Sequence, residues 1–333
     1  MIELKGINRL NPETLKVVPP SPVSEIEVDS LTPATVIWGR LLKKHPEIIS
    51  IDIAHYPSQA HGTSDRYWTH TIPAMVAEQT LTKGLVPNAN ERLEDAFAIS
   101  SLVGVSVSKD PIDDREGYYA LWIEGGSKYP EAYRAFVTLD LETQANDRTL
   151  RSILNPLSHI DCNWYLLQSG ASYHLILDDL VSPKELINNW AGLINLLNPT
   201  PSWEESLGHL NFFRRYDIGD ALRQAGNDVV SLRRLVQELL PEFGHIDQPD
   251  KLKQTRLVDV RWVLHSIGEI CDLLEGRNTS AAFLRISGSK RYESPPLLTA
   301  EKDNLGLKVY RPKSNVFMSK QAEFPFDCDT CVL

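Results

Sequence analysis

Two carboxylates that end an apolar run in the middle of the chain give the first chemical signal. Residues 135–139 read Ala-Phe-Val-Thr-Leu, and Asp140 and Glu142 follow with one leucine between them. Side chains alternate faces along a strand, so the two acids would point the same way, about 7 Å apart. Like charges on one face repel each other unless solvent or a cation screens them. The spacing therefore predicts either an open strand end or a pair of divalent cations roughly 4 Å apart, as phosphoryl transfer uses.

A serine and a histidine two residues apart give the second signal. Ser172 and His174 follow a turn signal at Ser169-Gly170, and on a strand they share one face with Ile176. A hydroxyl and an imidazole on an open face can both donate hydrogen bonds to a phosphate. The usual explanation of such a histidine is a half-buried side chain with a satisfied hydrogen bond. By itself the pair does not decide between the two.

The third signal is Asp259, which precedes an apolar helical pattern at 260–274. Aspartate is among the best N-cap residues, so capping alone explains its position. A carboxylate has further lone pairs, however, and one that caps a helix can also bind a metal. Four polar residues after the next strand form either a solvated turn or a cradle for a triphosphate. They are Arg285, Ser287, Lys290 and Arg291.

Periodic patterns place these residues on a small number of elements. Residues 163–177 predict a β-hairpin, and residues 182–197 predict a helix that opens with a capping box formed by Ser182 and Glu185. Further helices are predicted at about 33–44, 72–82, 90–101 and within 203–243, and further strands at 47–53, 118–123 and 281–286. Gly125-Gly126 and the region of Pro130 mark an internal boundary.

In their order and spacing, these motifs resemble the archaeo-eukaryotic primase superfamily, the catalytic domain of primases and primase-polymerases. That family has an apolar strand ending in acid-x-acid, then small-x-His, then an apolar residue followed by Asp. The matching residues are Asp140 and Glu142, Ser172 and His174, and Val258-Asp259. The stretch after the third motif is also similar, with Arg261, the Leu-Arg-x-Ser and basic turn of 284–291, and the Pro-Pro-Leu of 295–297. The resemblance spans roughly residues 126–300.

The resemblance implies a fold and a reaction. The fold would be α+β, a primase-type palm with an RRM-like antiparallel sheet flanked by helices across 126–315. An N-terminal α/β module (1–125) would precede it and a tail (316–333) would follow. The protein would be a template-directed nucleotidyltransferase acting on nucleoside triphosphates and a single-stranded template, in replication or repair. A zinc-binding insertion, which such proteins can carry, is missing from this sequence.

The resemblance also implies roles for single residues. Asp140, Glu142 and Asp259 would be catalytic and hold Mg²⁺ or Mn²⁺. The nucleotide-binding residues would be Ser172, His174, Arg285, Ser287 and Lys290, and the residues along the template Arg256, Arg261 and Arg291.

Charge is unevenly distributed along the chain. The formal net charge is -10, yet residues 211–320 hold 18 Lys and Arg against 14 Asp and Glu. This asymmetry suits a polyanion channel on one part of the surface, although ordinary solvated helix faces explain it equally well.

Other sequence features bear on location and partners. No apolar run approaches the roughly 18 residues that span a bilayer, and residues 1–6 lack the start of a secretory signal. We therefore expect a cytoplasmic protein without a membrane partner, and leave a protein partner open. Cys328 and Cys331 form a lone C-x-x-C that supplies only half of a structural zinc site, so a disordered or weakly redox-active tail is favoured over zinc binding.

Two alternatives stay open at this point. The chain could keep a primase-like fold but act as a nucleic-acid or nucleotide-binding module without turnover, in a mobile-element or defence system. It could also be an unrelated α+β protein, because each motif is short and occurs by chance.

Overall fold

A computed structural model describes residues 18–56, 68–87, 96–105, 132–197, 218–244, 257–277, 279–288 and 294–313. The strands in these ranges are β1 (Val23–Val28), β2 (Ile48–Tyr56), β3 (Trp68–Pro73), β4 (Ala96–Val105), β5 (Tyr133–Leu141), β6 (Trp164–Ser169), β7 (Ser172–Val181), β8 (Phe283–Arg285), β9 (Leu297–Asp303) and β10 (Gly306–Pro312). The helices are α1 (Ala34–Lys44), α2 (Ala74–Leu81), α4 (Asp147–Leu157), α5 (Pro183–Leu197), α7 (Ile218–Ala225), α8 (Val229–Gly244) and α10 (Val260–Leu274).

The strands join into a single ten-stranded sheet. Its order is β1-β10-β9-β6-β7-β5-β4-β2-β3, and β8 pairs with β4 outside this path. The β1–β10 pair is parallel and the other described pairs are antiparallel. The predicted α+β class is therefore confirmed, with a mixed sheet that is largely antiparallel.

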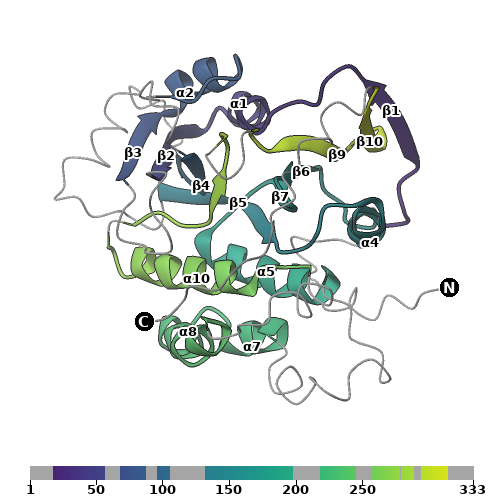
Figure 1. The fold of residues 1–333 in the computed structure, drawn as a ribbon. Helices are drawn as coiled ribbons and strands as arrows, with labels where there is room; N and C mark the ends of the chain where they lie inside the picture. Colours follow the sequence, from purple (N-terminus) through teal and green to yellow (C-terminus); the bar gives the residue numbers. More distant parts are fainter. Residues whose placement is uncertain are drawn as a thin grey trace, which may run out of the picture.

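Helices cover both faces of the sheet (Figure 1). α1 and α2 lie on one face and form an apolar cluster with residues such as Phe136 and Ile176. α5 and α10 lie on the other face, and α7 and α8 pack beneath them as a further layer. β5 and β7 are thus covered on their two faces by helices that are far apart in the sequence.

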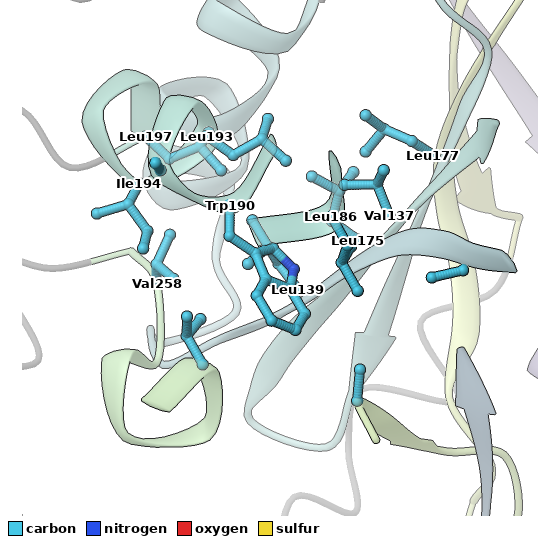
Figure 2. Close-up of a cluster of buried hydrophobic side chains, with 14 of the residues drawn as sticks. Val137, Leu139, Leu175, Leu177, Leu186, Trp190, Leu193, Ile194, Leu197 and Val258 are labelled. Atoms are coloured by element: carbon cyan, nitrogen blue, oxygen red, sulfur yellow. The ribbon is translucent and has the colours of Figure 1, made fainter. Parts of the chain in front are cut away.

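The core between α5 and the central strands is built around Trp190 (Figure 2). Leu139 and Leu175 project from β5 and β7 toward this side, as the two-residue period of a strand requires. The indole Nε1 of Trp190 donates to the carbonyl oxygen of Thr138 at 2.7 Å. A buried indole N–H is thereby satisfied, and α5 is fixed against the strand that carries Asp140.

Several predicted elements are confirmed. β6 and β7 form the hairpin, with Ser169 opposite Ser172 and Gly170 at a positive φ of 64°. At the start of α5 the N–H of Glu185 donates to Ser182 Oγ and the N–H of Ser182 donates to the Glu185 carboxylate, which is the predicted capping box. The predicted helices 33–44 and 72–82 and the strands 47–53 and 281–286 correspond to α1, α2, β2 and β8.

The predicted helix at 90–101 is wrong, because residues 96–105 form β4. β4 lies inside the sheet between β5 and β2 and is buried on both faces. A strand buried on both faces has no alternation of apolar and polar residues, so its apolar run resembles a buried helix. α4 and the β9–β10 hairpin are elements for which the sequence analysis made no prediction.

Strands from both sides of the predicted boundary near residue 125 belong to the same sheet. β4 pairs with β5 and β8, and β1 pairs with β10. The boundary itself, the strand predicted at 118–123 and the tail with Cys328 and Cys331 lie outside the described residues and stay predictions. Of the helices in the described ranges, none has the length and apolar character needed to cross a membrane.

Candidate functional site

The first and third motifs meet through a backbone hydrogen bond. The N–H of Asp259 donates to the carbonyl oxygen of Asp140 at 2.9 Å. Asp259 also caps α10, because its Oδ1 accepts from the N–H of Trp262 at 3.0 Å. Two acids from distant parts of the sequence are thus brought together at the end of β5. The capping role predicted for Asp259 is confirmed.

Asp140 lies near the end of β5, where the sheet opens. Its side chain keeps 30% of its surface exposed. Burial and, to a smaller extent, the negative charges of Asp259 and Glu142 together raise the pKa of Asp140 to about 8, against the opposing positive charge of Arg285. Glu142 follows the last residue of the strand and is exposed. The acids therefore repel one another in a partly dehydrated place, which is the situation that a cation relieves.

Burial also raises the pKa of Asp259, although the backbone N–H groups of Trp262 and Arg261 oppose this change. Burial thus disfavours the charged form of both neighbouring carboxyls, Asp140 and Asp259. Arg261 itself is exposed on the first turn of α10, one position after Val260.

His174 faces Asp140 across the β5–β7 pair. The two residues are register partners, so their side chains lie on the same face. The His174 Nε2 and the Asp140 Oδ1 are 3.7 Å apart, which is longer than a hydrogen bond. Burial, with a smaller contribution from the positive charge of Arg285, lowers the pKa of His174 to about 3. The imidazole is therefore neutral at ordinary pH and carries one N–H donor.

Buried polar atoms without a hydrogen-bond partner gather on this same face of the sheet. They are His174 Nδ1, Thr138 Oγ1 and, from α1, Trp38 Nε1. Thr138 lies two residues before Asp140, and the Trp38 ring contacts Phe136 of β5 edge-on at 5.6 Å. Buried polar groups are normally satisfied, so the unpaired atoms of His174 and Thr138 close to Asp140 indicate a place where water or a polar ligand binds.

Arg285 joins the site from β8 and is held by three oxygen atoms. Its guanidinium donates to the carbonyl oxygens of Ser287 and Ser294, at 2.6 and 3.0 Å, and to Ser169 Oγ at 3.2 Å. The positive charge of Arg285 acts on the pKa of both Asp140 and His174, and that of Arg261 acts on Asp259. Ser169, which the sequence interpretation missed, connects Arg285 to the β6–β7 turn. Its position at the turn before Ser172 was the available signal.

Two of the predicted phosphate donors form hydrogen bonds within the chain. Ser287 Oγ accepts from the N–H of Phe97 at 2.9 Å and donates to the carbonyl oxygen of Gly288. Ser172 Oγ donates to the carbonyl oxygen of Ser169 at 3.4 Å, a long bond that a stronger acceptor could replace. The remaining predicted site residues, Arg256, Lys290 and Arg291, lie outside the described residues.

The acids at this site suit a hard cation. Mg²⁺ is usually held by one or two carboxylates together with water and substrate phosphates. Within the described ranges, no three His, Cys, Asp or Glu side chains gather closely enough to hold a metal by themselves. The predicted ligands Asp140, Glu142 and Asp259 are therefore not such a group by themselves, and a cation held there would need further oxygen ligands from water or a substrate.

Comparisons of this chain with protein-family models, with curated proteins and with solved structures gave no match.

Proposed function

We propose that this protein is a template-directed nucleotidyltransferase of the primase or primase-polymerase type. It would join nucleoside triphosphates along a single-stranded nucleic-acid template with Mg²⁺ or Mn²⁺. The single observation that carries the proposal is the convergence of the three motifs. Asp140 and Asp259 are joined by a backbone hydrogen bond, and His174 faces Asp140 from the neighbouring strand.

The residues divide by their chemistry. Asp140 and Asp259, with Glu142 at the rim, would hold the divalent cations, since hard cations prefer carboxylate oxygens. When bound, such cations activate a hydroxyl nucleophile and neutralise the charge that develops on leaving pyrophosphate. The neutral imidazole of His174 would donate to a phosphate oxygen of the nucleotide, and Arg285 would neutralise its charge. Ser172 would exchange its long bond for a phosphate oxygen.

A second candidate is a primase-like module that binds nucleotides or nucleic acid without turnover. Two observations favour it: His174 exposes only 4% of its surface, and the described residues hold no three-ligand metal group. A bound phosphate would have to reach a nearly covered imidazole, so a binding role at the rim of the site needs less movement than catalysis does.

One experiment separates the candidates. Pure protein is incubated with a single-stranded template, labelled nucleoside triphosphates and Mg²⁺ or Mn²⁺, beside an Asp140→Ala variant. The enzyme predicts product that the variant does not make, and the module predicts nucleotide or template binding without product. Product formation that survives in Asp140→Ala would contradict the proposed site.

A further inference from the structure

A cavity of about 190 Å³ lies on the α1 side of the sheet, away from the acids. Its lining residues come from the end of β1, the segment before α1, α1 itself and the β9–β10 hairpin. They are Val28, Ser30, Leu31, Thr32, Arg40, Leu298 and Tyr310. This volume holds about six water molecules at roughly 30 Å³ each, so it can receive one ring system rather than a long ligand.

The walls of the cavity are fixed by backbone hydrogen bonds. The N–H of Leu298 donates to the carbonyl oxygen of Thr32 at 2.8 Å, and the N–H of Lys313 donates to that of Val28 at 2.9 Å. Pro33 forms an isolated β-bridge with Leu297. The cavity is thus held in shape before any ligand binds, which lowers the entropy cost of binding.

The lining combines a cation, an aromatic ring, hydroxyls and an apolar floor. Arg40 is exposed on α1 and lines the cavity together with Tyr310. Lys43, three residues further along α1, is exposed as well. Ser30 and Thr32 add hydroxyl groups. A flat ring joined to an anion can stack on the aromatic ring, pair with the cation and accept hydrogen bonds from the hydroxyls. A nucleotide has that composition.

Two acids of the β9–β10 hairpin, Glu301 and Asp303, lie near Tyr310. Glu301 accepts a hydrogen bond from the Tyr310 hydroxyl at 2.6 Å, and Lys308 Nζ lies 3.8 Å from its carboxylate. The same ammonium pairs with Asp303, so the two acids share Lys308, and Arg40 is a further cation beside Tyr310. The Tyr310 hydroxyl is fixed in position, and the flat ring contributes to the cavity wall.

A row of register partners connects the cavity to the catalytic acids. Asp140 pairs with His174, His174 with Leu167, and Leu167 with Leu298, which lines the cavity. Three strand steps of about 4.8 Å place Leu298 roughly 14 Å from Asp140. Leu167 and Leu298 belong to the apolar cluster on the α1 side, the same side toward which Asp140 and His174 point. The cavity thus lies within the length of a few nucleotides from the acids, and because Leu167 and Leu298 are buried, a strand of nucleic acid would have to pass around the side chains that cover them.

We infer that this cavity binds one nucleotide of the single-stranded template, with its base against Tyr310 and its phosphate on Arg40. The inference rests on the proposed function, since it assigns a place to the template of that same reaction. A base stacked on an aromatic side chain contributes about 1–3 kcal/mol to single-strand binding, or roughly tenfold or more in affinity.

The test is the affinity of a fluorescent single-stranded oligonucleotide, measured by anisotropy in EDTA across a salt series. Tyr310→Leu removes the flat ring and keeps an apolar side chain, and we expect it to weaken binding about tenfold. Arg40→Ala should weaken binding. It should also reduce the steepness of log affinity against log salt concentration by about one, because one phosphate contact is lost. Tyr310→Phe keeps the ring and should bind nearly as the wild type. The matched control is Lys83→Ala, which removes an exposed charge on the loop after α2.

The outcomes separate this inference from the proposed function. Three results would overturn the cavity as a template site. In the first, Arg40→Ala and Tyr310→Leu both bind the oligonucleotide as tightly as the wild type. In the second, Lys83→Ala loses as much affinity as they do, and in the third, the wild type does not bind the oligonucleotide. If Tyr310→Leu fails to fold by thermal melting, the exposed Arg40→Ala decides alone. Nucleotide incorporation is measured separately. A protein that binds the oligonucleotide through the cavity but makes no product would contradict the proposed function, while the cavity would remain a binding site for single-stranded nucleic acid.

Discussion

The backbone N–H of Asp259 donates to the carbonyl oxygen of Asp140, so the start of α10 is tied to the end of β5 at the candidate site. The bond positions two carboxyls without using either carboxylate. Both side chains therefore keep lone pairs for a cation, even though Asp259 also caps its helix. This arrangement allows capping and metal binding to be separated by mutation.

Asp259→Asn should keep the helix cap and abolish activity. Asparagine caps about as well as aspartate but carries no charge, so we expect stability within about 0.5 kcal/mol of the wild type. Asp259→Ala removes the cap as well and should cost about 0.5–2 kcal/mol. Urea denaturation checks both values, and nucleotide incorporation should be lost in both variants. An active Asp259→Asn protein would limit this residue to a structural role.

Asp140→Asn should stabilise the metal-free protein in a pH-dependent way. The carboxyl has a pKa of about 8 in the folded protein against an ordinary 3.8, so the folded state binds more protons between these values. Wild-type stability must then fall as pH rises from about 4 to 8. The variant lacks this loss and should gain about 1 kcal/mol at pH 8, a modest value because the side chain is partly exposed.

Thermal melts of the two proteins at pH 4.5 and pH 8, in EDTA, measure this difference. The exposed Glu142→Gln is the matched control and should change less. Adding Mg²⁺ should stabilise the wild type and leave Asp140→Asn unchanged. If the difference in melting temperature between Asp140→Asn and the wild type were the same at both pH values, the burial of the Asp140 charge would be contradicted.

Arg285→Lys should lower both stability and nucleotide affinity. Lysine keeps the charge, but it cannot reach the carbonyl oxygens of Ser287 and Ser294 together as the guanidinium does. One unpaired carbonyl costs about 1–3 kcal/mol when buried, and less at the exposed Ser294. We expect a loss of about 1 kcal/mol in urea denaturation and a higher KM for nucleotide. Ser169→Ala removes only one bond of 3.2 Å and should have the smaller effect.

His45→Gln should destabilise the protein at low pH more than at high pH. The hydrogen bond to Asp178 raises the pKa of His45, although burial opposes this change. A raised histidine pKa adds stability below about pH 6.5 that is lost as pH rises through the folded-state pKa. Urea denaturation should therefore show a cost of about 1 kcal/mol at pH 5.5 and a smaller one at pH 9. A cost that grows with pH would contradict this pairing.

Local signals in the sequence are sufficient for the elements that carry the site. The Ser182–Glu185 capping box, the Ser-Gly turn before Ser172 and the cap at Asp259 each depend on residues close together in the chain. Such signals predict where an element begins and which face it presents. They predicted the β6–β7 hairpin, α5 and α10.

Long-range pairing has no such signal. β4 is buried on both faces, so the periodicity of its sequence does not separate a central strand from a buried helix. The pairing of β1 with β10 joins the two ends of the described chain, and neither strand predicts the other. Arg285 reaches Ser169 only because β8 adds to β4 outside the main order of the sheet. The cavity at Arg40 and Tyr310 depends on the same kind of pairing.

The most direct test of the central claim is nucleotide incorporation on templates that differ in a single base. With Mg²⁺ or Mn²⁺ present, the wild type should add the nucleotide complementary to each template base, and Asp140→Asn and Asp259→Asn should add none while melting as folded proteins. A wild type that adds no nucleotide on any template, or variants that add it as the wild type does, would contradict the account.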